Sequence, residues 1–182
     1  MAGLAALSGP IELCRPELLY PRRRDRGGFD CGDERLNEWL RRYAGQNRRN
    51  DTAATWVIAT REGRVAAYAS RSMTGIDRSA VPDGLGKGAP NPVPGLLIGR
   101  LAVDRTFSGQ GVGSALVLHA LVAAVDLDAS AACRAVVVVA LSEEAKAWWM
   151  RLGLRCFDED DDSCLDLYLI TAEIPESLDR VG

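Results

Sequence analysis

Hydrophobic positions in the first half of the chain follow first a helical and then a strand period. Between residues 36 and 43 an apolar residue recurs every three or four positions, which predicts an amphipathic helix with an arginine-rich opposite face. Residues 55–60 and 65–70 are apolar and β-branched, and the four residues between them suit a hairpin turn. This half therefore predicts a helix followed by a β-hairpin, with residues 11–14 as a short strand before the helix.

The second half of the chain alternates strands with helices. Residues 95–103 and 135–141 are apolar runs, and the second contains four consecutive valines, which is typical of a strand covered on both faces. Helices are predicted to follow these strands at residues 112–125 and 142–152, and a last strand is predicted at residues 165–171. The order of elements predicts a mixed sheet flanked by helices, of the α/β or α+β class.

Length and composition indicate one folded domain. The 182 residues predict a single domain over residues 1–182, with residues 1–10 flexible and a long Gly/Pro-rich loop at residues 74–95. Hydrophobic residues make up 47% and charged residues 26%, which argues against a disordered or fibrous chain. No uninterrupted apolar stretch approaches the roughly 18 residues of a membrane span, so we expect a cytoplasmic protein without membrane contact. The odd number of cysteines favours free thiols over disulfides or a metal site: Cys14, Cys31, Cys133, Cys156 and Cys164.

The net charge of −3 conceals an uneven distribution. Residues 1–90 carry 15 Lys and Arg against 11 Asp and Glu, whereas residues 91–182 carry 7 against 14. A basic surface binds nucleic acid by releasing the counterions of its phosphates, although a solvated helix face has the same composition. The residues predicted to contact RNA phosphates are Arg22, Arg23, Arg24, Arg41, Arg42, Arg48, Arg49 and Lys87.

A glycine-rich turn, Ser108-Gly109-Gln110-Gly111-Val112-Gly113, lies between a predicted strand and a predicted helix. Backbone N–H groups converge at such a turn, and the missing Cβ atoms let an anion approach. The spacing matches neither the dinucleotide fingerprint nor the P-loop, because position 114 is not glycine and no Gly-Lys-Ser or Gly-Lys-Thr occurs. By spacing alone the turn is either an anion site or a tight connection.

With its flanking residues, the turn resembles the central motif of the GNAT superfamily of N-acetyltransferases. The resemblance rests on residues 97–104 and 108–116. It extends to residues 29–40, to the Pro-rich residues 90–94 and to residues 144–154, which are similar to the TacT-type branch. That branch comprises toxins that acetylate the α-amine of aminoacyl-tRNA. The resemblance implies the GNAT fold, with a mixed and mostly antiparallel sheet splayed between its fourth and fifth strands.

The resemblance also implies a cofactor site and partners. Backbone groups of Leu101, Ala102 and Val103 would hold the thioester and pantetheine of acetyl-CoA, and those of Ala102 and Val103 would act at the reacting carbonyl. The amine would attack directly within a ternary complex. Expected partners are tRNA, a ribbon-helix-helix antitoxin and a second copy of the chain. The backbone amides expected to bind the phosphates of acetyl-CoA belong to Ser108, Gly109, Gln110, Gly111, Val112, Gly113 and Ser114.

Three positions depart from the family pattern. The turn begins with Ser108 in place of Gln or Arg, and Gln110 replaces a basic residue, which weakens the attraction for pyrophosphate. Trp149 stands where the family has the tyrosine that protonates the departing thiolate, and an indole has no acidic proton near neutral pH. We expect Trp149 to line the acyl pocket, Trp148 to lie in the core, and His119, the only histidine, to lie on the helix surface or to pack.

These departures leave three functions open. The expected function is acetylation of aminoacyl-tRNA with acetyl-CoA, without a tyrosine acid. One alternative is a CoA-independent enzyme, with no cofactor, that transfers the aminoacyl group of aminoacyl-tRNA to a small-molecule amine in specialised metabolism. The other is a GNAT-fold module that binds a ligand without catalysis.

Overall fold

The computed structural model describes residues 12–20 and 24–174. Within these residues seven strands form one sheet in the order β1-β2-β3-β4-β5-β7-β6. Strands β4 and β5 pair in parallel and the other neighbouring strands pair antiparallel, which confirms the predicted mixed, mostly antiparallel sheet. The strands are β1 Glu17–Leu18, β2 Ala54–Ala59, β3 Val65–Ile76, β4 Val93–Val103, β5 Ala135–Val139, β6 Arg155–Cys156 and β7 Asp166–Ile170.

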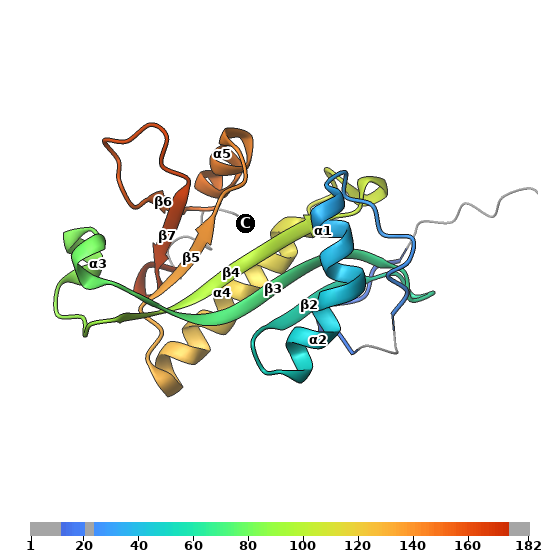
Figure 1. The fold of residues 1–182 in the computed structure, drawn as a ribbon, viewed down its shortest axis with the longest axis horizontal. Coiled ribbons are helices and arrows are strands. Elements are labelled where there is room, and N and C mark those ends of the chain that lie inside the picture. The colour runs from blue at the N-terminus through green and yellow to red at the C-terminus, as the bar shows by residue number, and fades with distance from the viewer. Residues whose placement is uncertain (1–11, 21–23, 175–182) are drawn as a thin grey trace, which may run out of the picture.

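Helices cover both faces of the sheet (Figure 1). Helix α1, Glu34–Glu38, continues through a π-helical turn, Trp39–Tyr43, into α2, Ala44–Arg49, and together they cover one face. Helices α4, Val112–Ala131, and α5, Glu143–Arg151, pack on the opposite face. The short helix α3 and the single-turn helices lie in connections: α3 Asp83–Gly86, and the turns Arg78–Ala80, Arg105–Phe107 and Thr171–Glu173.

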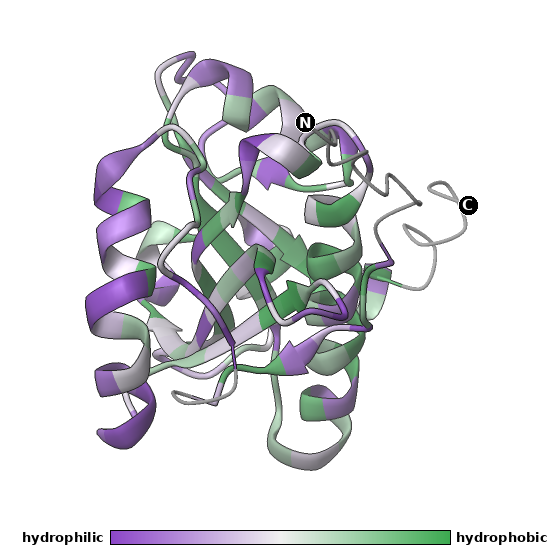
Figure 2. Cartoon of the chain, turned by 90° about the vertical axis from the view of Figure 1, so that its right-hand side faces the viewer, coloured by the Kyte–Doolittle hydropathy of each residue, from purple (hydrophilic) through white to green (hydrophobic). Residues whose placement is uncertain are grey.

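Among the described residues, the side chains of the strands contribute to three buried clusters, one on the side of α4 and α5, one under the α1–α2 helix and one beside α3. In β5, Val136 and Val138 pack against α4 and α5, whereas Ala135 and Val137 pack on the other face beside α3. The valine run is therefore buried on both faces, as predicted. Figure 2 shows the apolar strands between a predominantly hydrophilic α1–α2 helix on the left and more hydrophobic helices on the right.

Several element boundaries differ from the prediction. Strand β3 continues through Ile76 and β4 begins at Val93, so the predicted loop over residues 74–95 is shorter and contains α3. The first named strand is β1, and around residues 11–14 only an isolated bridge between Leu13 and Thr60 is described. The short strand β6 was not predicted, because a strand of two residues is too short to show an alternation of apolar and polar positions.

Helix α4 is long and apolar enough to cross a membrane by length and composition. The sequence prediction considered only uninterrupted apolar runs, and α4 contains Asp126 and Asp128. In the fold one face of α4 packs on the sheet, where Leu116, Val117 and Leu121 are buried, and the opposite face is exposed.

Candidate active site

The candidate site is a cleft of about 500 Å³ at the point where β4 leaves β5. The two strands pair from Gly95 opposite Ala135 to Ile98 opposite Val138, and this pairing ends there. At the same point β4 contains a bulge, because Gly99 has no partner on β3. A bulge bends a strand and increases its twist, so β4 diverges from β5 and leaves its backbone edge unpaired toward the cleft.

Three segments form the walls of the cleft. The edge of β4 forms the floor, the α1–α2 helix one wall, and the end of β5 with α5 the other. The guanidinium of Arg100 lies 4.7 Å from the ring centroid of Trp39, so a cation and an aromatic ring sit together at the mouth. The lining residues are Asp33, Arg35, Leu36, Trp39, Tyr43, Ile98, Gly99, Arg100, Leu101, Ala102, Val103, Gly113, Val139, Leu141, Ala145, Trp148 and Trp149.

The glycine turn joins β4 to α4 beside this cleft. Gly109 and Gly111 have positive φ angles of 74° and 77°, and a Cβ built on either would meet no atom within 4 Å. Gly113 differs, because its Cβ would lie 3.2 Å from Val103 Cγ2 and close to Trp148. The first two glycines therefore keep an exposed turn open in the left-handed region, and the third permits close packing of α4 on β4. The turn precedes a 20-residue helix, whose N-terminus attracts anions.

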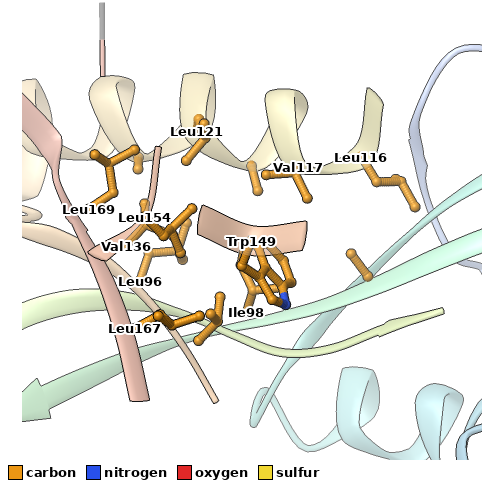
Figure 3. Packing of buried hydrophobic residues seen from close by; sticks show 14 of the residues in the cluster. Leu96, Ile98, Leu116, Val117, Leu121, Val136, Trp149, Leu154, Leu167 and Leu169 are labelled. Carbon is orange, nitrogen blue, oxygen red and sulfur yellow. The ribbon is translucent and has the colours of Figure 1, made fainter. Parts of the chain in front are cut away.

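Two tryptophans of α5 border the cleft. Trp149 is 6% exposed and packs between α4 and β4, beside Ile98 (Figure 3). Trp148 is half-buried, and its ring meets that of Trp149 edge-on at 4.9 Å. Both line the cleft, so the expectation that Trp148 lies in the core is wrong: it packs against the core from a partly exposed position.

Comparison with known proteins identifies the family. Residues 19–154 match the acetyltransferase (GNAT) family. This chain belongs to the GNAT acetyltransferase family. A tRNA-acetylating toxin of Mycobacterium tuberculosis is 32% identical to it over 132 residues, which are 72% of this chain and 79% of the toxin. The family, the fold and the enzyme class predicted from the sequence, an N-acyltransferase of the TacT type, are thereby confirmed.

Solved structures of similar proteins share the whole fold. A tyrosine-to-phenylalanine variant of KacT superposes with a TM-score of 0.83 at 27% identity, covering 90% of this chain and 98% of KacT. AtaT complexed with acetyl-methionyl-tRNAfMet gives 0.81 at 27% identity, covering 92% and 99%. AtaT proteins have also been solved with acetyl-CoA and with the C-terminus of the antitoxin AtaR.

The GNAT fold brings some of the predicted site residues together and separates others. Leu101, Ala102, Val103 and Gly113 line the cleft with Trp149. The exposed part of the turn, residues 108–111, lies outside the lining residues, at the N-terminus of α4.

The predicted RNA-contacting residues do not form one patch. Arg22 and Arg23 lie outside the described residues. Lys87 lies just after α3, which Figure 1 shows well apart from α2. Four arginines form ion pairs: Arg24 with Glu17, Arg41 with Glu34, Arg42 with Glu38 and Arg48 with Asp51. Arg49 is exposed at the end of α2.

Other residues of the cleft were not predicted from the sequence. Tyr43 belongs to the predicted apolar face of the helix over residues 36–43, and its side chain is exposed and lines the cleft together with Leu36 and Trp39 of the same face. Arg35, which pairs with Asp33 at 2.7 Å, and Arg100 also line the cleft. Arg35 and Tyr43 come from the α1–α2 helix and Arg100 from β4, so they lie near one another only because two segments that are distant in sequence meet in the fold.

Asp104 joins the segment before α1 to the end of β4, which forms the floor of this GNAT cleft. Its residue is 1% exposed, and its carboxylate accepts hydrogen bonds from the backbone N–H groups of Asp30, at 3.1 Å, and Thr106, at 2.9 Å. The Arg64 guanidinium lies 2.9 Å away. Burial alone would raise the pKa of the Asp104 carboxyl, but these hydrogen bonds outweigh burial and lower the pKa. Asp104 thus holds the segment before α1 against the end of β4.

Replacing Asp104 by asparagine should lower the free energy of unfolding by about 1–3 kcal/mol at pH 7. A depressed folded-state pKa stabilises the fold above the ordinary carboxyl pKa of about 3.9, and this contribution disappears as the pH falls through the folded-state pKa. Urea unfolding at pH 7 and at acidic pH measures both values. The exposed Asp126→Asn serves as control, and a deficit of Asp104→Asn that stays constant down to acidic pH would contradict this role.

Proposed function

We propose that this GNAT enzyme acetylates the α-amine of aminoacyl-tRNA, with acetyl-CoA as the acyl donor. The observation that carries the proposal is the unpaired edge of β4, which forms the floor of an apolar cleft and leads into an open glycine turn. The similarity to a tRNA-acetylating toxin and to AtaT in complex with acetyl-methionyl-tRNAfMet supports the same substrates.

The cleft residues suit a thioester donor. The turn around Gly109 and Gly111 offers backbone N–H groups to the donor's phosphates, and its open space leaves room for them. The backbone N–H of Val103 faces away from β3 at the edge of β4 and can donate to the acyl oxygen as negative charge develops there, whereas the N–H of Ala102 faces β3. The amine forms the amide bond as the thiolate departs. Gln110, whose side chain donates to the Thr106 carbonyl at 3.1 Å, adds no positive charge for the phosphates.

The acid step is where this chain differs from the family pattern. Trp149 carries no proton that an acid step at neutral pH can use, so the departing thiolate takes its proton from water. General acids contribute about 10²–10⁴ to a rate, so we expect slow turnover by the wild-type protein. The cleft still positions the acyl donor and the amine. In a direct transfer, this positioning contributes more to the rate than a general acid does.

The proposal extends to partners. By analogy with AtaT bound to the C-terminus of AtaR, we propose that the enzyme is a cytoplasmic toxin that pairs with a ribbon-helix-helix antitoxin. A second copy of the chain belongs to the same proposal as a further partner.

The direct test combines purified protein, acetyl-CoA labelled in the acetyl group, and charged or uncharged tRNA. After ribonuclease digestion, the label should appear as N-acetylaminoacyl-adenosine with charged tRNA only, because uncharged tRNA lacks the amine. Absence of label with every charged tRNA would overturn the proposal. If the aminoacyl group instead moved from tRNA to an added small-molecule amine without acetyl-CoA, the CoA-independent alternative would replace it.

RNA contact by α1–α2 can be tested through the salt dependence of tRNA binding. Each lost phosphate contact should flatten the slope of log affinity against log salt by about 0.7–0.9. Replacing Arg41 and Arg42 together by glutamine should therefore reduce the slope by about twice that amount. The control is Arg61→Gln on the hairpin turn, where an exposed arginine also pairs with a carboxylate. An unchanged slope in the double variant would remove both arginines from the interface.

A further inference from the structure

A second groove, of about 540 Å³, lies apart from the cleft. It runs between the loop after α2, the middle of β3 and the C-terminal half of α4, and it shares no lining residue with the cleft. Its walls are largely apolar, from Trp56, Met73, Leu96 and Leu127. The groove is therefore separate from the site of the proposed acetylation.

The groove contains a buried arginine without a counter-charge. Arg71 of β3 is 5% exposed, and its guanidinium stacks 4.5 Å from the ring centroid of Trp56. Its Nη1 donates to the backbone carbonyl of His119 at 3.4 Å, and Nη2 lies 3.1 Å from His119 Nδ1. Among residues 12–20 and 24–174, no carboxylate lies within ion-pairing distance of Arg71.

Arg71 remains charged despite its burial. Desolvation lowers the pKa of its guanidinium to about 10, which still leaves the group protonated at neutral pH. A buried charge without an opposite charge is unfavourable, and a carboxylate in hydrogen-bonding geometry offsets that cost. An apolar side chain at position 71 would fill the same site without this penalty, so the fold alone does not explain the arginine.

The charged residues that line the groove favour a ligand with a single carboxylate. Arg48 on the rim is already paired with Asp51, at 3.3 Å, so these two charges cancel and the charge of Arg71 is left. Because the Arg48–Asp51 pair is neutral as a whole, the rim offers no net positive charge to a chain of phosphates. The groove therefore suits one acidic group on an apolar body better than a nucleic-acid backbone.

The apolar wall of the groove spans a strand and a helix. Met73 of β3 is 53% exposed on this wall, and methionine adapts its shape to different partners. Helix α4 adds Ala123 and Leu127, which lie four residues apart and therefore on one face of the helix. A wall of separate apolar side chains on two elements suits a segment of chain that presents several apolar side chains to it.

We propose that this groove docks a segment of a partner protein in which one Asp or Glu stands among apolar side chains. The carboxylate pairs with Arg71, and the apolar residues cover Trp56, Met73 and Leu127.

The test begins with selection of a displayed random-peptide library on the wild-type protein and on Arg71→Leu. Wild type should enrich peptides with one acidic residue flanked by apolar residues, and the variant should not. The best peptide is then titrated while the indole N–H resonances of the four tryptophans are followed. Only the Trp56 resonance should move, because the other three tryptophans line the cleft.

A double-mutant cycle measures how much the ion pair between Arg71 and the peptide's carboxylate contributes to binding. Exchanging the peptide's acidic residue for its amide should weaken binding about tenfold or more on wild type and should make no difference on Arg71→Leu. Unchanged cleft resonances show that the variant is folded, and Met73→Glu, at an exposed position, provides a second variant that should lose peptide binding. The same preference for acidic peptides on both proteins would overturn the proposal, as would equal binding of acid and amide. So would movement of the Trp56 resonance by single-stranded RNA or by self-association instead of by the peptide.

Discussion

Replacing Trp149 by tyrosine should raise kcat for acetylation of aminoacyl-tRNA by about 10²–10⁴. Trp149 lines the cleft at the position where the GNAT family pattern has a tyrosine, and a phenol can give a proton to a departing thiolate whereas an indole cannot. Single-turnover measurements with acetyl-CoA and charged tRNA give the rate of the chemical step.

The matched control is Trp149→Phe, which removes the same bulk and adds no hydroxyl group. Because Trp149 is buried between α4 and β4, both variants should lose about 0.5–3 kcal/mol of stability. Only the tyrosine variant should gain rate. Equal rates for the two variants would show that loss of the thiolate's acid does not limit this enzyme.

Replacing Gly111 by asparagine should weaken acetyl-CoA binding by about 10- to 150-fold, because hydrogen bonds to charged groups contribute about 1.5–3 kcal/mol. Asparagine tolerates the left-handed conformation of Gly111 better than other side chains, so the fold is retained. Its side chain occupies the open space over the turn, where phosphate would approach the backbone.

The control for this substitution is Gly63→Asn in the turn between β2 and β3. Gly63 also has a positive φ, of 96°, and does not line the cleft. Both variants carry a similar backbone strain. A difference between their affinities for acetyl-CoA, measured by calorimetric titration, therefore reports only the blocking of the phosphate site by the asparagine side chain of the Gly111→Asn variant. Equal affinities of the two variants would mean that the glycine turn does not hold the phosphates.

Local sequence determines much of this fold. The turn at residues 108–113 and the valine run of β5 were predictable because glycine conformation and strand burial depend on neighbouring residues. The π-helical turn at Trp39–Tyr43 was not, because the apolar spacing of the sequence also fits an unbroken α-helix.

Features that depend on tertiary contacts could not be predicted from the sequence. Arg71 follows a run of small residues in β3, and only the packing of α4 and Trp56 shows that its charge is buried. Lys87 counts with the basic half of the chain by sequence, yet the fold places it far from α2. The role of Asp104 likewise depends on contacts with Asp30 and Arg64, which are 74 and 40 residues away in sequence.

The central claim is that the cleft between β4 and β5 holds acetyl-CoA despite Gln110 and Trp149. Isothermal titration of the purified wild-type protein with acetyl-CoA tests it most directly. The unpaired β4 edge and the open glycine turn predict saturable binding of one acetyl-CoA per chain, with a Kd in the micromolar range. Absence of binding at millimolar acetyl-CoA would contradict the claim.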